Sequence, residues 1–269
     1  MLVAARAGAW SPSGKNPPAY GGLCFTAESA NSSVQLTAVG SAPAVTLVKS
    51  FDGVNWEAYA VGEVIDLPSV GDFVYLAAGE GGNETFGSST SAYHQFVING
   101  LVAASGDITS LRRFDLEQTT LASYCYKSMF QDCTGLTSTP ELPATTLASN
   151  CYGSMFNGCT GLMSAPELPA TTLATACYRS MFQGCTGLTI APELPATKLE
   201  RICYQSMFDG CTNLSLIKVH FTTWVSQTNS WVSGVSPTGT FYKPSALPEE
   251  YGTDKIPTGW TVVNIDKTT

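Results

Sequence analysis

Eight of the nine cysteines recur at a fixed spacing, and their thiols are the side chains of this chain with the most chemistry to offer. Converging thiolates could bind a metal ion, and neighbouring thiols could form disulfides. Seven residues separate Cys125 from Cys133, unlike the Cys-x2-Cys spacing of metal sites, and the chain has only two histidines. In a helix these Cα atoms would lie about 12 Å apart, too far for a bridge. We therefore predict small buried residues and no metal or cofactor, with disulfides between non-helical parts left open.

These cysteines belong to a 26-residue unit that occurs four times, beginning at Leu121, Leu147, Leu173 and Leu199. A constant period of this length is typical of a solenoid, in which each unit buries its apolar face only against its neighbours. Within a unit, leucine, two cysteines and methionine are spaced by four. This spacing predicts a short helix or helical turn that places them on its inner face.

A glycine follows each helical segment, at Gly135, Gly161 and Gly187, and Asn213 replaces it in the fourth copy. Glycine and asparagine are the residues that best tolerate left-handed backbone, so we predict a left-handed turn at this position. The Pro-Glu-Leu-Pro segment that follows in the first three copies cannot continue a strand ladder, which limits any strand to about residues 136–139.

The sequence on either side of the repeat has a different pattern. Alternating polar and apolar residues before it predict strands, and Asp52-Gly53 between two such runs predicts a hairpin. After Leu214 the period ends, as expected where an atypical segment covers the last apolar face of a solenoid. We predict a mainly β chain with short helical turns, in four regions: a tail or linker at 1–20, a β-sandwich at 21–107, a solenoid at 108–216 and a β-rich C-terminal cap at 217–269.

The charge of the chain limits the kinds of partner that it could bind. The formal net charge is -8, with no basic stripe to neutralise phosphates, which argues against nucleic acid and anionic membrane surfaces. No apolar run approaches the roughly 18 residues of a membrane span, so we expect no membrane insertion. The first residues lack the apolar stretch of a secretory signal, and we therefore expect no export by that route.

Positions that differ between otherwise faithful copies are candidates for recognition, because variation in a constant frame indicates solvent exposure. One such position holds Lys127, Gly153, Arg179 and Gln205. Beside it stands a column of tyrosines, which could be half-exposed and stack on sugar rings or could border the core. The candidate recognition surface comprises Lys127, Arg179, Gln205, Tyr126, Tyr152, Tyr178 and Tyr204.

No residues form a recognisable catalytic arrangement, and we expect a protein that is not an enzyme. Glu141, Glu167 and Glu193 repeat in step and predict a solvated column of carboxylates, with a calcium site as the alternative. Glycoside hydrolysis needs two carboxylates in different environments, whereas stacked copies supply identical ones. His94 and His220 have no serine or cysteine partner in a nucleophile motif.

The repeat resembles the BspA-type leucine-rich repeats found in gut Bacteroidetes and in their phages and mobile elements. The likeness rests on Cys-Tyr-Gly-Ser-Met-Phe-Asn-Gly-Cys-Thr-Gly-Leu at 151–162 and Ala-Pro-Glu-Leu-Pro at 165–169, and it covers region 108–216. Segments at 23–28, 50–56 and 71–75 resemble a β-domain that precedes such repeats in phage and prophage structural proteins. Segments at 233–241 and 256–260 resemble the usual ending of those proteins.

This resemblance implies a non-enzymatic virion protein, namely a head fibre, tail fibre or decoration protein, which is assembled in the cytoplasm of the bacterial host. The N-terminal domain would bind other virion proteins, and the solenoid would bind a glycan or protein of the host surface for attachment. A homo-oligomer, with a trimer favoured, would suit a fibre. The alternative is a leucine-rich-repeat adhesin at the bacterial cell surface.

Overall fold

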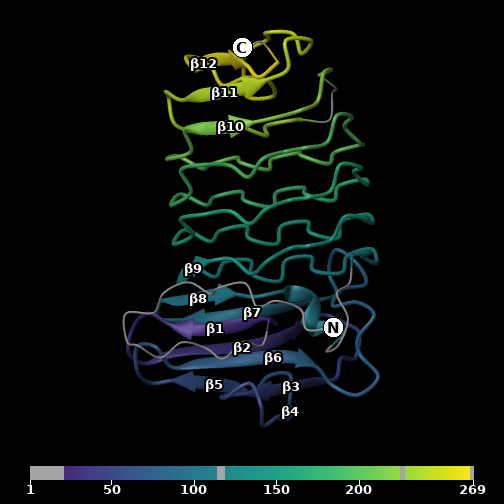
Figure 1. Cartoon of the computed structure of the whole chain (residues 1–269), viewed down its shortest axis with the longest axis vertical. Coiled ribbons are helices and arrows are strands. Elements are labelled where there is room, and N and C mark those ends of the chain that lie inside the picture. Colours follow the sequence, from purple (N-terminus) through teal and green to yellow (C-terminus); the bar gives the residue numbers. More distant parts are fainter. Residues whose placement is uncertain (1–20, 114–118, 225–227, 267–269) are drawn as a thin grey trace.

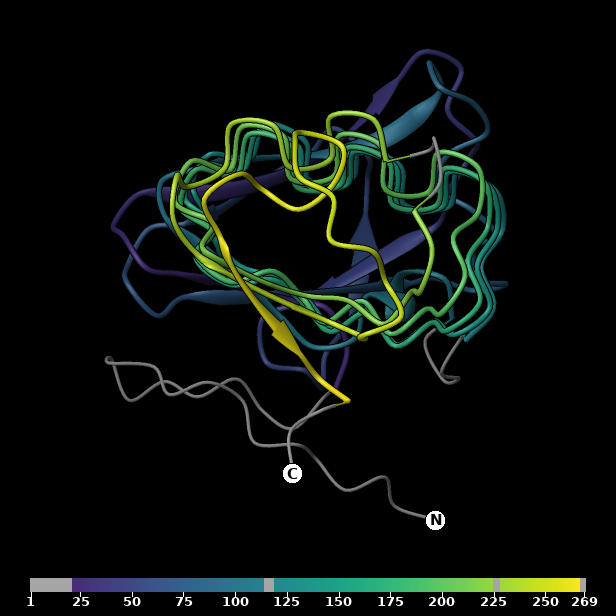
Figure 2. The ribbon, with the colours of Figure 1, turned by 90° about the horizontal axis from the view of Figure 1, so that it is seen from above.

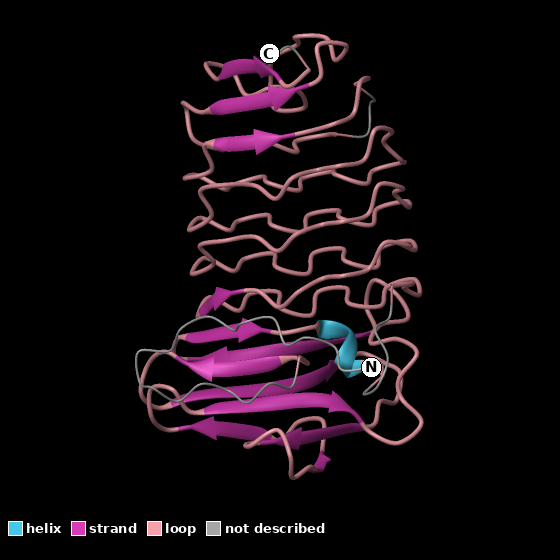
Figure 3. Ribbon diagram, in the orientation of Figure 1, coloured by secondary structure: helices cyan, strands magenta, loops and turns pink. Residues whose placement is uncertain are grey.

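The computed structural model describes residues 21–113, 119–224 and 228–266, and the predicted tail at 1–20 lies outside them. The chain is mainly β, as predicted (Figure 3). Two sheets form the N-terminal end. The first has the order β4-β3-β6-β1-β8-β9 and the second the order β5-β2-β7. In chain order the strands are β1 (Cys24–Ala27), β2 (Ser32–Val39), β3 (Leu47–Ser50), β4 (Glu57–Tyr59), β5 (Val64–Leu67), β6 (Phe73–Ala78), β7 (Tyr93–Asn99), β8 (Val102–Ser105) and β9 (Leu136–Ser138).

Inward-facing residues of the two sheets share one core. The ring of Phe25 in β1 lies 4.9 Å from that of Phe96 in β7, and both side chains are fully buried. Alternation along each strand supplies these apolar residues, because successive side chains point to opposite faces of a sheet. The predicted hairpin is also present, since β3 and β4 pair in antiparallel fashion around the turn at Gly53.

The first sheet continues directly into the repeat. Strand β8 pairs in parallel with β9, which belongs to the first 26-residue unit, and the Val102 amide donates to the Gly135 carbonyl at 2.9 Å. One cluster of buried residues runs from Leu23 to Trp260. The predicted boundary between residues 107 and 108 therefore does not separate two cores.

From this junction the chain winds in coils that stack along the long axis of the molecule (Figure 1), and the coils superpose when seen from above (Figure 2). Backbone hydrogen bonds join each coil to the next. The amide of Tyr126 donates to Cys151 at 2.8 Å, and the amide of Phe130 donates to Met155 at 2.8 Å. The same pairs recur one copy later, with an offset of 25 residues between donor and acceptor.

The segment predicted to be a short helix or helical turn consists of turns and contains no helix. Over the described residues the one helical element is the short 3-10 helix η1 (Ile108–Leu111), which precedes the first copy. In the first copy, left-handed residues stand at every fourth position, namely Tyr124, Ser128 and Asp132 with φ of 59°, 55° and 59°. Each one interrupts the right-handed helix and turns its amide towards the next coil. The period of four is kept by consecutive turns instead of a helix.

The prediction of left-handed backbone at Gly135, Gly161, Gly187 and Asn213 is also wrong, because none of them has positive φ. The left-handed position lies three residues earlier, at Asp132, Gly158, Gly184 and Gly210. Glycine at the later position has a different cause. A Cβ atom on Gly135 would lie 1.9 Å from the carbonyl oxygen of Gly100, and one on Gly161 would lie 2.5 Å from that of Thr134.

Alanine in place of Gly135 is therefore expected to lower the free energy of unfolding by about 1–3 kcal/mol, because the junction must open to admit the methyl group. Urea denaturation measures this change. Gly153→Ala is the matched control, since its Cβ would meet nothing closer than 3.5 Å. Equal stability of the two variants would contradict the close approach at Gly135.

Ile202 has a strained backbone, with φ of 47° at a left-handed position where the second copy has Asn150. A β-branched residue is poorly tolerated there, because its Cβ crowds the following carbonyl. Ile202→Asn is expected to raise the free energy of unfolding by about 1 kcal/mol. Thermal denaturation tests this, and Asn150→Ile should move the melting temperature in the opposite direction. A fall in stability on Ile202→Asn would show that the packing of the isoleucine outweighs its strain.

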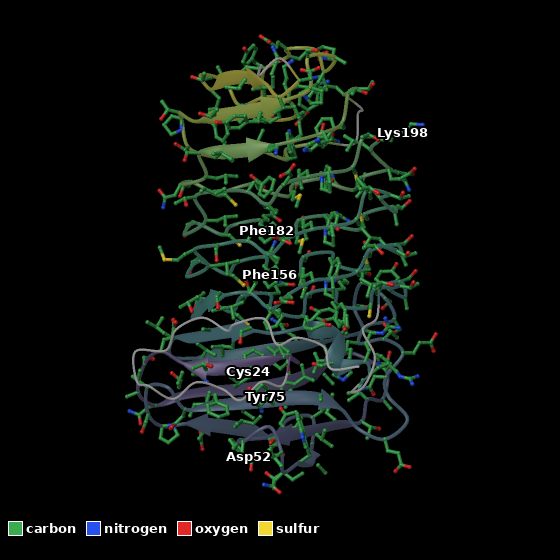
Figure 4. The ribbon with its side chains drawn as sticks, viewed as in Figure 1. Cys24, Asp52, Tyr75, Phe156, Phe182 and Lys198 are labelled. Carbon is green, nitrogen blue, oxygen red and sulfur yellow. The ribbon has the colours of Figure 1, made fainter. Side chains whose placement is uncertain are left out.

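Two columns of aromatic rings fill the stack. Phe156 lies 5.4 Å from Phe130 and 5.6 Å from Phe182 (Figure 4 labels Phe156 and Phe182), and these rings are nearly parallel. A parallel column of tyrosines has spacings of 5.9–6.1 Å. Each column continues towards the N-terminal end, one through Phe96 in β7 and the other through Phe86 in the connection between β6 and β7. Successive rings belong to successive coils, so the core repeats with the sequence.

A parallel sheet of β10 (Leu216–Lys218), β11 (Thr240–Lys243) and β12 (Thr261–Asn264) forms the other end of the stack. Trp231 is fully buried there, 6.5 Å from Tyr204 and 6.2 Å from Phe208, where both aromatic columns end. The described residues contain no helix with the length and apolar character needed to cross a bilayer.

Candidate functional site

The four predicted variable positions form one column along the stack. The Ser128 amide donates to the Gly153 carbonyl at 2.9 Å, and the Ser154 amide donates to the Arg179 carbonyl at 2.8 Å. Arg179 is exposed, whereas Lys127 and Gln205 are half-buried. The column therefore brings Lys127, Arg179 and Gln205 together on one face, with Gly153 as a gap between the two cations.

The two cations have different surroundings. The ammonium of Lys127 lies 4.3 Å from the centre of the Tyr93 ring and 2.9 Å from Ser128 Oγ, so it turns towards the N-terminal sheets. Burial, followed by the charge of Arg179, lowers the pKa of Lys127. Arg179 forms no ion pair among the described residues. Its guanidinium is therefore the donor in this column that is best placed to meet a ligand.

The four tyrosines do not belong to this surface. Tyr126, Tyr152, Tyr178 and Tyr204 are each at most 1% exposed, so the interpretation as half-exposed platforms for sugars is wrong. Burial raises the pKa of Tyr152 and of Tyr178 well above the ordinary range, and neither hydroxyl has a hydrogen-bond partner among the described residues. Their stacking between coils places them in the core, where they contribute to stability.

All nine cysteines are buried free thiols, in agreement with the prediction of small buried residues. In each unit the second thiol donates to a carbonyl of the preceding coil. Cys159 donates to Phe130 at 2.9 Å, Cys185 to Phe156 at 3.0 Å and Cys211 to Phe182 at 2.9 Å. Burial raises the pKa of Cys125 to about 11 and that of Cys133 to about 12. These thiols stabilise the stack and are poor nucleophiles at neutral pH.

We therefore expect the native protein to resist thiol reagents at pH 7.5. Less than one of the nine cysteines should react with maleimide before unfolding, and all nine should react in denaturant. Intact-mass spectrometry counts the adducts in both conditions. Rapid modification of the folded chain would show that a coil opens readily.

The predicted column of carboxylates lies at the surface, because Glu141, Glu167 and Glu193 are all exposed. Glu193 also accepts from Lys218 Nζ at 2.9 Å and from His220 Nε2 at 2.5 Å. The hydrogen bond from Lys218, helped by that from His220, lowers the pKa of Glu193. The described residues contain no group of three or more His, Cys, Asp or Glu side chains that could hold a metal ion.

The two histidines occupy different environments. His94 is buried, its Nδ1 lies 3.0 Å from the Phe86 carbonyl oxygen, and burial lowers its pKa. His220 pairs with Glu193 at the surface. Sequence reasoning did not identify this pair or its neighbour Tyr242. The alternating run Leu-Ile-Lys-Val-His-Phe at 216–221 was the available signal, since it directs Lys218 and His220 to one face of a strand.

No protein-family model, no curated protein and no solved structure matches this chain.

Proposed function

We propose that the protein is a non-enzymatic structural component of a phage particle, a head fibre, tail fibre or decoration protein. In this proposal a BspA-type leucine-rich-repeat solenoid lies between an N-terminal β-sandwich and a β-rich C-terminal cap. The N-terminal end binds the particle, and the remainder faces the host surface. The resemblance of the repeat and its flanks to phage proteins of this order supports the proposal.

The observation that most directly supports this proposal is that one hydrophobic core runs from the N-terminal end to the C-terminal end. Phe96 stacks on Phe130 at 5.1 Å, the phenylalanine column crosses all four copies, and Phe208 meets Trp231 at 6.2 Å. Backbone hydrogen bonds join successive coils alongside it. Stacked units of this kind are held by their neighbours and act as a spacer between two ends. A spacer of this kind suits an attachment protein better than a catalyst that closes around a substrate.

Features of the N-terminal end support its role as the docking end. The carboxylate of Asp52 accepts from the amides of Val54 at 2.8 Å and Asn55 at 2.7 Å, which shapes the β3–β4 loop (Figure 4). This loop exposes Phe51 and Val54, which are 49% and 75% accessible. A depression of about 390 Å³ adjoins Phe51. Exposed apolar side chains around a depression are typical of protein contacts.

The remaining surface would serve recognition. The column that contains Lys127 and Arg179 runs over the coils, and Arg179 lacks an acidic partner among the described residues. A trimer would present three such columns around a common axis and would strengthen weak individual contacts through multivalency.

Mass spectrometry of phage particles purified by density gradient from gut Bacteroidetes cultures tests the proposal. Peptides of this chain should copurify with capsid and tail proteins, and labelled antibody should decorate the particles in electron micrographs. Recovery in the bacterial envelope fraction, with none in particles, would overturn the phage assignment in favour of the surface adhesin.

Binding of the fluorescently labelled protein to intact Bacteroidetes strains that differ in capsule tests host recognition separately. We expect binding to some strains and not to others, with Arg179→Ala weakening it about fivefold or more, the loss of about 1 kcal/mol. Met163→Ala, at an exposed side chain of the second unit, is the control. Absence of binding to every strain would leave a purely architectural role in the particle.

A further inference from the structure

The sheet β10-β11-β12 lies at the end of the molecule away from the N-terminal sheets (Figure 1). Its outer face carries a depression of about 660 Å³. Its lining mixes apolar and polar side chains, among them Leu216, Lys218, His220, Tyr242, Val263 and Asp266. The alternate residues Ile217, Val219 and Phe241 are buried in the core. The sheet therefore directs one set of residues inwards and leaves the other set to form the depression.

We propose that this depression binds a neutral saccharide, one or two sugar rings of a longer glycan. This inference rests on the proposed function, because it makes the end of the stack opposite the docking end the recognition end. Its volume falls within the range of small-ligand sites, which combine an apolar floor with a few placed polar groups.

The floor matches the apolar face of a sugar. Lys218, Tyr242 and Val263 lie in register on the three neighbouring strands. Parallel strands stand about 4.8 Å apart, so this row spans about 10 Å, which two linked rings would cover. The Tyr242 ring is half-buried, and its hydroxyl bonds to none of the described residues. An aromatic ring with an apolar face and a free polar tip can stack on sugar C–H groups and bond a hydroxyl.

The rim supplies oriented hydrogen-bonding groups. Glu193 is held by Lys218 Nζ at 2.9 Å and His220 Nε2 at 2.5 Å. Asp266 is held by the Ser245 amide at 2.9 Å and by Ser245 Oγ at 2.6 Å. A carboxylate has about four lone-pair sites, so Glu193 keeps acceptors for sugar hydroxyls, and the Lys218 ammonium keeps donors. Such groups suit a ligand whose hydroxyls both donate and accept hydrogen bonds.

Charge decides between a neutral and an anionic ligand. The Lys218 ammonium in the lining is paired with Glu193 at 2.9 Å, and the whole chain has a net charge of -8. Sulfate, phosphate or uronate groups would be repelled by this net charge, and the Lys218 ammonium is already paired. A polyhydroxylated ligand without charge avoids this repulsion and uses the same hydrogen bonds.

Saturation-transfer NMR of the full chain with cellobiose, maltose, lactose, xylobiose, mannobiose and chitobiose tests the inference. We expect saturation transfer to at least one of these disaccharides and none to a sulfated analogue. Tyr242→Ala should weaken the affinity about tenfold or more, the loss of one stacking contact, whereas Tyr242→Phe should retain most of it. Tyr251→Ala is the matched control, since that side chain is 51% exposed and outside the depression.

Val263→Lys provides a second test. Val263 lines the depression, so a longer side chain there would block its floor and leave the core intact. Absence of transfer to every disaccharide at 10 mM, a concentration at which a Kd of about 1 mM gives near saturation, would overturn the inference. Binding unchanged by both Tyr242→Ala and Val263→Lys would also overturn it. Particle proteomics does not depend on sugar binding, so failure of this site and failure of the phage assignment give different results.

Discussion

Replacing Phe182 with alanine is expected to lower the free energy of unfolding by about 3–5 kcal/mol, the usual cost of removing a buried phenylalanine. The ring is fully buried, with Phe156 and Phe208 at 5.6 and 5.8 Å on its two sides. Removal leaves a gap in the middle of the column, and the coils cannot close it because their backbone hydrogen bonds hold them apart. Urea denaturation followed by circular dichroism measures the change.

Met163→Ala is the control, since this side chain is 66% exposed in the same stack and its truncation should change stability by less than about 0.5 kcal/mol. Phe156→Ala should cost about as much as Phe182→Ala, because both rings occupy the same place in successive copies. A loss below about 1 kcal/mol at Phe182 would mean that the aromatic column is not the continuous core that supports the proposed spacer.

Alkaline pH is expected to unfold the protein cooperatively between about pH 9 and 11. Burial raises the pKa of Cys133, Cys151 and Cys211 from 9.0 to about 12, so these thiols stay protonated in the folded state. In the unfolded state they ionise near pH 9. The stability from their burial is therefore complete below that pH and falls above it. Each such thiol removes about 1.4 kcal/mol per pH unit, or about 4 kcal/mol for the three at pH 10.

That loss is comparable to the whole stability of an ordinary domain, about 5–15 kcal/mol. The buried tyrosines add to it, because burial raises the pKa of Tyr126 and Tyr204 well above their ordinary value. Unfolding free energies measured in urea from pH 7 to 10.5 test the prediction. Cys151→Ala should be less stable at pH 7 and should show a shallower decline, since one titrating thiol is missing. A constant unfolding free energy to pH 10.5 would contradict it.

The repeat itself made much of the core predictable. Cys125 and Met129 recur in every copy, and apolar residues that recur at a constant place in each unit of a repeat are expected to be buried against the neighbouring units. The structure places these residues and their equivalents inside the coils with at most 2% exposure. The short strand near residues 136–139 was also predictable, because the prolines that follow it cannot donate hydrogen bonds.

The candidate site was predictable only in part. Variation between copies pointed to Lys127 and Arg179, and they do share one face of the stack. It gave no information about Tyr242, which lies after the last repeat and has no equivalent in the other copies to compare. The tyrosine column was included in the candidate recognition surface although the structure buries it. The sequence could not decide this, because an aromatic residue with a polar hydroxyl is compatible with surface and core alike.

Sequence alone determined the period, the buried set and the mainly β character, because each depends on local spacing and residue type. Tertiary structure alone decided the backbone path. Tyr124 and Ile202 both adopt left-handed φ although neither type favours it, and Gly135 is glycine because the carbonyl of Gly100, between β7 and β8, approaches it. Hydrogen bonds and contacts with distant parts of the chain outweigh local preference here. They join Tyr124 to Ser149 and bring Gly100 against Gly135, and spacing within one turn cannot reveal them.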